Sequence, residues 1–190
     1  MTTSRRSARQ RILDVASDLF YREGIRSIGV DTIAEKSGAS KATLYRHFPT
    51  KDDLIVAYLQ EKSELSLKQF DKLIEQYKGS PKEQIFAFIN AISDSLTEPE
   101  YRGCSFLNAY AEFSDIHHPV QRLVLEYNHE LRSRLIRLTK DAGVQDENLA
   151  DQLLLVINGA FSIGPILGAN GPAAQLKVVT TFLMDLHLKH

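Results

Sequence analysis

The chain has 190 residues, 43% hydrophobic and 25% charged, a composition that is ordinary for a soluble globular protein with a sizeable core. Its one cysteine excludes an internal disulfide framework, and the lack of a signal-peptide core or of an apolar run of about 18 residues favours a cytoplasmic protein. The net charge of −1 conceals a division: up to Lys51 there are ten Lys and Arg against five Asp and Glu, which leaves a net charge of −6 for the rest. This division favours an anion-binding head on a body with another task, although a merely uneven surface charge gives the same pattern.

Two helices are predicted first. Apolar residues recur at helical spacing over residues 5–23, and Gly24 is expected to end that helix. A shorter apolar stripe lies between Gly29 and Gly38 and predicts a second helix.

A third short helix follows a tight turn. Gly38 can take the left-handed conformation that ends the second helix, Ser40 offers a capping hydroxyl, and Pro49 ends the third. Leu44 and Phe48, four residues apart, are expected to point inward. The opposite face carries side chains that donate hydrogen bonds or stack, namely Lys41, Thr43, Tyr45, Arg46 and His47. This pattern suits the major groove of DNA and predicts a recognition helix, whereas a helical hairpin with solvated charges is the alternative.

The rest of the chain also predicts helices. A long helix over 51–77 begins at Thr50, and Ser80 is expected to cap a helix that runs from Pro81 to about residue 96. Further helices are expected over 104–113, over 119–142, from a cap at Asp146 to about 167, and from Pro172 to about 188. We therefore predict an all-α fold of about nine helices, with a head at 1–50 and a body at 51–190 that the 51–77 helix links.

The first quarter resembles a known family. The residues Gly24, Val30-Asp31-Thr32-Ile33-Ala34, Ser37 to Phe48, Lys51 and Leu54 closely match the N-terminal domain of TetR-type bacterial transcriptional regulators, without gaps over roughly residues 9–55. Residues 102–109 resemble a segment that is common in a large subset of these regulators. The resemblance implies a homodimeric one-component repressor, not an enzyme, whose head binds an operator and whose body binds a small-molecule inducer, with no cofactor.

The resemblance also implies roles for residues at the DNA. Lys41, Ala42 and Tyr45 would approach bases or nearby backbone, while Thr43 and Arg46 would be more variable readers. Gly29 replaces the Ser or Thr that commonly caps the second helix, so that hydroxyl contact to phosphate is absent. Arg5 and Arg6 could follow the DNA groove or backbone as an N-terminal arm, and His47 and Lys51 would hold phosphates. The predicted DNA-binding set is Arg5, Arg6, Ser40, Lys41, Ala42, Thr43, Tyr45, Arg46, His47 and Lys51.

Aromatic residues of the body are candidates for a ligand pocket. They are spread over four predicted helices that could surround one cavity, with a few polar groups to orient a ligand. The predicted pocket residues are Phe86, Phe106, Tyr110, Phe113, Tyr127, Asn158 and Phe161, and ordinary core packing is the alternative for each of them.

The last two predicted helices are apolar on more than one face. In a body of this size, the second face is most simply buried against another copy of the chain in a four-helix interface. The predicted interface residues are Leu154, Ile157, Phe161, Val179, Phe182, Leu183 and Leu186, and a monomer with a dense core is the alternative.

Two other kinds of chemistry remain as alternatives. Cys104 could sense oxidants or electrophiles if Arg102 and a helix start stabilised its thiolate, although a lone cysteine is more often a small buried hydrophobe. The chain would then be a cysteine-responsive or ligand-independent DNA-binding regulator. An all-α enzyme or carrier is less well supported, because no nucleophile-base pair or phosphate-cradling loop is visible. No metal site is expected from the residues near the 113–119 break, which are Glu112, Asp115, His117 and His118.

Overall fold

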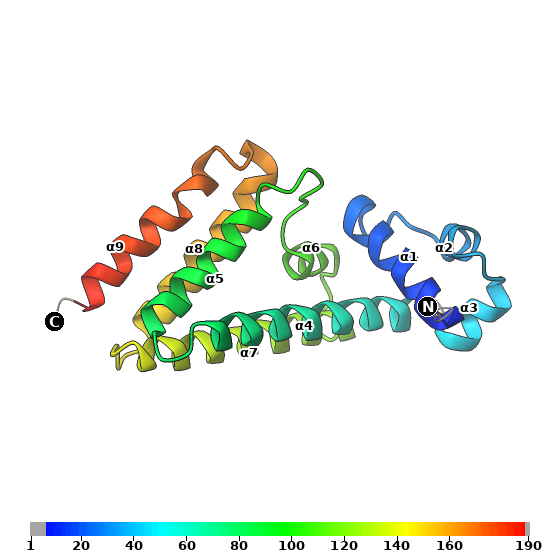
Figure 1. The fold of residues 1–190 in the computed structure, drawn as a ribbon. Helices are drawn as coiled ribbons and strands as arrows, with labels where there is room; N and C mark the ends of the chain where they lie inside the picture. Colours follow the sequence, from blue (N-terminus) through cyan, green and yellow to red (C-terminus); the bar gives the residue numbers. More distant parts are fainter. Residues whose placement is uncertain (1–6, 189–190) are drawn as a thin grey trace, which may run out of the picture. The chain divides into compact units, whose positions relative to one another are not determined.

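The computed structural model describes residues 7–188, and this part of the chain is all-α, as predicted (Figure 1). It contains α1 (Ala8–Glu23), α2 (Val30–Ser37), α3 (Lys41–His47), α4 (Lys51–Gln76), α5 (Pro81–Ser95), α6 (Ser105–Glu112), α7 (Pro119–Asp141), α8 (Asn148–Leu167), the 3-10 turn η1 (Pro172–Gln175) and α9 (Leu176–Leu188). No strand occurs within residues 7–188.

The helices form two compact units. The head unit contains residues up to 63 together with 105–124, and the body unit contains 64–104 together with 125–190. Helices α4 and α7 each continue from one unit into the other, whereas α6 lies wholly in the head unit. The predicted functional boundary at residue 50 is a separate division, and it stays a prediction.

Local capping explains where the helices of the head begin and end. Gly38 adopts a left-handed conformation with φ of 64° and ends α2, and the Ser40 hydroxyl accepts a 3.1 Å hydrogen bond from the Thr43 N–H to open α3, both as predicted. At the start of α4 the Thr50 hydroxyl accepts from the Asp53 N–H, and the Asp53 carboxylate accepts from the Thr50 N–H, which is a complete capping box.

Two of the predicted helix starts in the body are shifted, and one predicted cap makes no hydrogen bond. Ser80 makes no side-chain capping bond, although Pro81 does occupy the first turn of α5. Asp146 lies one residue before the N-cap of α8, from which its carboxylate accepts the Asn148 N–H at 2.9 Å. Pro172 opens the 3-10 turn η1, and α9 begins only at Leu176. The differences at α8 and α9 are shifts of a few residues, because several side chains near a helix end can serve the same free N–H groups.

The body unit has one large hydrophobic cluster, to which α4, α5, α7, α8 and α9 contribute. Helix α9 contacts both α5 and α8, and α4 runs beside α7 (Figure 1). The α4–α7 pair is joined by the Arg134 guanidinium, which donates to the Asp71 carboxylate at 2.9 Å, and by the hydroxyls of Ser66 and Tyr127, 2.9 Å apart.

Helix α8 is unusually apolar. It is the one helix within residues 7–188 whose length and mean hydropathy, 1.4, would suit a membrane span, and 33% of that stretch is buried. Asp151 and Asn158 interrupt its apolar residues, so the sequence shows no unbroken run. The core helix of a soluble protein can have the same composition, and α8 contributes Leu149, Leu153 and Ile157 to the body cluster.

Candidate functional site

Helix α3 has one buried face and one accessible face. Leu44 is fully buried and Phe48 is nearly so, and the Arg9 guanidinium lies 5.0 Å from the centre of the Phe48 ring. Tyr45 and Arg46 are exposed on the other side. The inward positions are therefore confirmed, and α3 offers a short, polar, solvent-facing surface.

The structure places the other predicted DNA-binding residues in different settings. Ala42 is exposed, whereas Thr43 and His47 are half-buried. The Ser40 hydroxyl is already used as the cap of α3 and also lies 3.0 Å from the Thr43 hydroxyl. Arg5 and Arg6 lie outside the described residues. Contact with DNA stays a prediction for the whole set.

Both lysines of the set have partners in the head. The Lys41 ammonium lies 2.6 Å from the Asp31 carboxylate, whose hydrogen bond and charge raise the pKa of Lys41. The Lys51 ammonium donates to the Ile25 carbonyl at 2.7 Å, and burial lowers the pKa of Lys51. Lys51 therefore holds the α1–α2 turn in the DNA-free head, a role that its position in the sequence did not indicate.

Helix α6 is hydrogen-bonded to the α1–α2 turn through Glu112. The Glu112 carboxylate accepts the N–H groups of Ile25 at 2.9 Å and Arg26 at 2.7 Å, so it binds two backbone donors that the turn would otherwise leave to water. The Arg26 guanidinium lies 5.4 Å from the centre of the Phe113 ring. The side-chain amide of Gln121 donates to the Phe113 carbonyl and thereby ties the start of α7 to the end of α6.

His118, one of the four residues considered for a metal site, packs against its neighbours. His118 stacks on Phe113 with ring centres 4.4 Å apart, its Nδ1 accepts the Val120 N–H at 3.3 Å, and its Nε2 lies 3.4 Å from the Asp52 carboxylate. Within residues 7–188 no group of three or more His, Cys, Asp and Glu is arranged to hold a metal ion.

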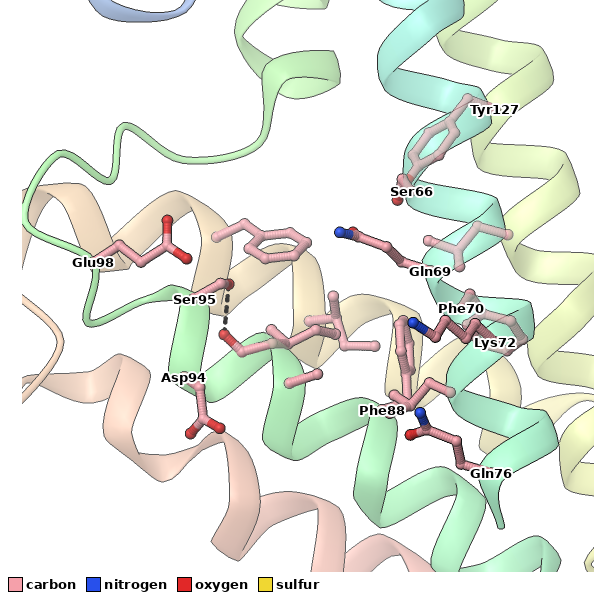
Figure 2. Close-up of a pocket in the computed structure, with 16 residues that line it drawn as sticks. Ser66, Gln69, Phe70, Lys72, Gln76, Phe88, Asp94, Ser95, Glu98 and Tyr127 are labelled. Carbon is pink, nitrogen blue, oxygen red and sulfur yellow. Dashed lines mark hydrogen bonds between the residues drawn. The ribbon is translucent and has the colours of Figure 1, made fainter. Parts of the chain in front are cut away.

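The body unit contains a cavity of about 560 Å³, lined by residues of α4, α5, α7 and α8 and by Glu98 just beyond α5. Figure 2 shows that Gln69, Lys72 and Gln76 of α4 lie on one side, opposite Asp94, Ser95 and Glu98. Apolar and aromatic side chains form the rest of the wall, namely Phe70, Leu73, Phe88, Ala91, Ile92, Tyr127, Leu131, Ile157 and Phe161. A volume of this size with a mainly apolar wall and a few polar groups suits a small organic molecule.

The predicted pocket residues divide into two groups. Tyr127 and Phe161 line the cavity, whereas Phe86 and Asn158 belong to the same unit but do not line it. The other three, Phe106, Tyr110 and Phe113, lie in the head unit. Sequence reasoning missed the α4 wall of the cavity, because Phe70 and the polar residues around it show only the ordinary pattern of an amphipathic helix.

Tyr127 ends in a hydroxyl pair at the edge of this cavity. Burial raises its pKa to about 12, and its hydroxyl lies 2.9 Å from that of Ser66. Cys104 is half-buried and close enough to Tyr127 for a thiolate to raise the pKa of that phenol further. Sensing by Cys104 stays a prediction.

Helices α8 and α9 expose a set of large apolar side chains, which we term the α8–α9 apolar face: Leu155, Ile166, Val178, Phe182 and Leu186. Leu155 and Phe182 are 73% and 68% exposed. Gly159 and Ser162 lie between Leu155 and Ile166 at helical spacing and are also exposed, so another helix could approach closely there.

Of the predicted interface residues, Phe182 and Leu186 belong to this face; Leu154, Phe161, Val179 and Leu183 are half-buried beside it. Ile157 is fully buried in the body core, so it offers no surface to a partner.

Comparisons with known proteins bear on both units. The sequence profile described as "Bacterial regulatory proteins, tetR family" matches residues 12–58. The solved structure of a TetR-family transcriptional regulator from Streptomyces coelicolor is 31% identical over 95% of this chain and 96% of that chain, with a TM-score of 0.90. A candidate TetR transcriptional regulator from Streptomyces avermitilis is 30% identical, with a TM-score of 0.83 over 96% of this chain and 98% of its own.

Curated relatives match a shorter part of the chain. An HTH-type transcriptional regulator of Staphylococcus aureus (strain USA300) is 35% identical over 72 residues, which are 38% of this chain and 39% of that protein. The match thus spans about two fifths of the relative, while the likeness to the two Streptomyces structures extends over the head and the body alike.

Proposed function

Because this chain belongs to the TetR family of bacterial transcriptional regulators, we propose that it is a ligand-responsive repressor, which a small molecule releases from a palindromic operator. Membership makes the chain a helix-turn-helix DNA-binding regulator rather than an enzyme. Repression, the effector and the release step are the proposed parts.

One observation carries the proposal at the DNA end. Helix α3 is fixed by the buried Leu44 and Phe48 and presents Tyr45 and Arg46 to solvent after a left-handed turn. Such a helix can lie in the major groove, where an arginine can form paired hydrogen bonds with guanine and a tyrosine can contact a thymine methyl or a phosphate.

The proposed dimer rests on the α8–α9 apolar face. Burial of Phe182 and its neighbours against a second copy would remove apolar side chains from water, and the two-fold axis would place two α3 helices on two half-sites. A near-palindromic operator with half-sites about one helical turn or a little more apart follows from this symmetry.

The proposed effector site is the cavity beside Tyr127. Helices α4 and α7 line it and continue into the head unit, so a ligand that shifted either helix would change the spacing of the two α3 helices. By linkage, DNA must weaken ligand binding by the factor by which ligand weakens DNA binding, and a coupling of roughly 1–3 kcal/mol is usual. A titration in which both bound independently would contradict the release step.

The DNA end of the proposal is tested by the double variant Tyr45→Ala, Arg46→Ala. We expect it to bind the DNA upstream of its own coding sequence at least about tenfold more weakly than the wild type, because it loses contacts that read base edges. Fluorescence anisotropy of a labelled fragment measures this affinity.

A matched control comes from the body unit. Tyr77 is 43% exposed, as Tyr45 is, and Arg137 is exposed on α7, so Tyr77→Ala, Arg137→Ala removes the same side-chain types away from α3. The control should bind as the wild type does. Unchanged binding by the α3 variant would show that α3 does not read this DNA.

A further inference from the structure

The ion pair between α2 and α3 engages Lys41, which is predicted to contact DNA when α3 lies in the major groove. Asp31 is in the first turn of α2, Lys41 is the first residue of α3, and their carboxylate and ammonium are 2.6 Å apart. We propose that Asp31 competes with DNA phosphate for Lys41 and thereby weakens sequence-independent binding of the head to DNA. This inference rests on the proposed position of Lys41 at the DNA.

The pairing distinguishes Lys41 from the other cations of these two helices. Lys36 and Arg46 have no carboxylate partner among residues 7–188, whereas Lys41 has one in direct contact. Asp31 also acts on the charge of its partner, since its hydrogen bond and its negative charge are the two largest causes that raise the pKa of Lys41. Of the cations on α2 and α3, Lys41 is thus the one whose positive charge is locally offset before DNA arrives.

The pair is suited to exchange because it is exposed. The side chains of Lys41 and Asp31 are 60% and 66% accessible, and ion pairs of this kind are weak and open readily in water. A phosphate can therefore take the ammonium. The carboxylate then stays beside the DNA surface, where it repels phosphate, or keeps a share of the lysine; in both cases less phosphate charge is neutralised.

The competition predicts a change in both affinity and salt dependence. Removing the Asp31 charge should tighten binding to DNA of any sequence by about two- to fivefold, the range that exposed ion pairs span. The slope of the logarithm of affinity against the logarithm of salt concentration should also become steeper, by up to about 0.9, the value for one further neutralised phosphate.

A thermodynamic cycle tests the inference. The wild type, Asp31→Asn, Lys41→Ala and the double variant are titrated onto a labelled duplex of arbitrary sequence, ~24 base pairs long so that it spans two half-sites. Anisotropy is recorded between about 50 and 200 mM KCl, where the salt effect is large. We expect Asp31→Asn to tighten DNA binding when Lys41 is present. The same substitution should have a clearly smaller effect on DNA binding in the Lys41→Ala background.

Asp18→Asn is the matched control. Asp18 forms an equally short pair, 2.6 Å from Arg22, that is somewhat less exposed, so its loss changes the net charge by the same amount on α1. Asp31 is also an acidic residue at a helix start, where its charge stabilises α2, so the Tm of each variant is measured. If Asp31→Asn lowers the Tm, then Asp31→Ser, whose hydroxyl suits a helix start, replaces it.

The outcomes separate the inference from the proposed function. A tighter Asp31→Asn complex that depends on Lys41 supports the inference. Equal tightening by Asp18→Asn, or equal tightening without Lys41, overturns it, because net charge alone would then explain the effect. If Asp31→Asn binds DNA with the affinity of the wild type, the inference is also overturned. The proposed function still stands in that case, because the wild type binds DNA. A wild type that bound no duplex even at the lowest salt would instead refute the proposed function itself.

Discussion

At the scale of single residues, Glu112 and Lys51 hold the α1–α2 turn from two directions. The carboxylate of Glu112 binds the N–H groups of Ile25 and Arg26, and the ammonium of Lys51 binds the Ile25 carbonyl. Both charged groups are far from the turn in sequence, and both satisfy backbone groups that a turn leaves without partners. The position of α2, and with it that of α3, thus depends on side chains from α4 and α6.

Glu112→Gln tests this dependence. A neutral amide presents one acceptor oxygen in place of two charged ones, so one of the two turn N–H groups loses a charge-assisted hydrogen bond. We expect a loss of about 1–3 kcal/mol, or roughly 3–10 °C in Tm for a chain of this size, measured by circular dichroism. Glu126→Gln, a change at an exposed carboxylate on α7, should leave the Tm unchanged. Equal Tm values for the two variants would contradict the role of Glu112.

At the scale of elements, the sequence predicts helices well and their assignment to units poorly. The α2–α3 turn was predictable to the residue, because Gly38 and Ser40 act on groups within a few positions of themselves. Helix α6 was expected to face the ligand, but the structure places it in the head unit, where Glu112 and Phe113 contact the α1–α2 turn. Such contacts join residues more than eighty positions apart, and helical periodicity carries no information about them.

The cavity shows the same limit. Aromatic content pointed to Tyr127 and Phe161, whereas the wall from α4 became visible only when α4, α5, α7 and α8 were packed together. Periodicity indicates that a side chain such as Phe70 faces inward. Whether that inward side meets a dense core or a cavity depends on the packing of neighbouring helices.

The pair formed by α4 and α7 in the body predicts a dependence of stability on pH. The Arg134 guanidinium donates to Asp71 and holds the pKa of that carboxyl below its ordinary value of 3.8. A carboxyl whose pKa is lower in the folded chain than in the unfolded chain stabilises the fold. This contribution is complete at pH values above the pKa of the unfolded chain, and it is lost as the pH falls through the pKa of the folded chain. The contribution should therefore be present near neutral pH and should begin to fall below about pH 4.

Asp71→Asn checks this expectation. The variant should have a lower Tm than the wild type at about pH 6, and the difference should shrink towards about pH 3 as the wild-type carboxylate is protonated. Glu64→Gln removes an exposed carboxylate from the same helix and should show no such convergence. A Tm difference for Asp71→Asn that stayed constant over this range would rule out the ion pair as its source.

At the scale of the whole molecule, the α8–α9 apolar face is the feature that most needs a partner. Several large apolar side chains that stand open to water on two neighbouring helices are unusual for a lone soluble chain. The exposed Gly159 and Ser162 between Leu155 and Ile166 leave room for a second helix. A second copy of the chain, related by a two-fold axis, would cover the face with the same residues.

Phe182→Glu tests the dimer. A carboxylate in the centre of an apolar interface would have to be buried without a partner, so the variant should sediment as a monomer where the wild type sediments as a dimer. Leu65→Glu places the same charge at a 52% exposed position of α4 and should leave the dimer intact. A Phe182→Glu chain that remained dimeric would exclude this face as the interface.

The same face has a consequence for how much of the regulator a cell must hold. If the chain acts as the proposed dimer, only a dimer presents two α3 helices to an operator. When the chain is scarce, the concentration of dimer is proportional to the square of the concentration of monomer. Operator occupancy then falls faster than the number of copies when expression drops or when a dividing cell shares few copies between its daughters. The α8–α9 apolar face would therefore make operator occupancy depend more steeply on expression level.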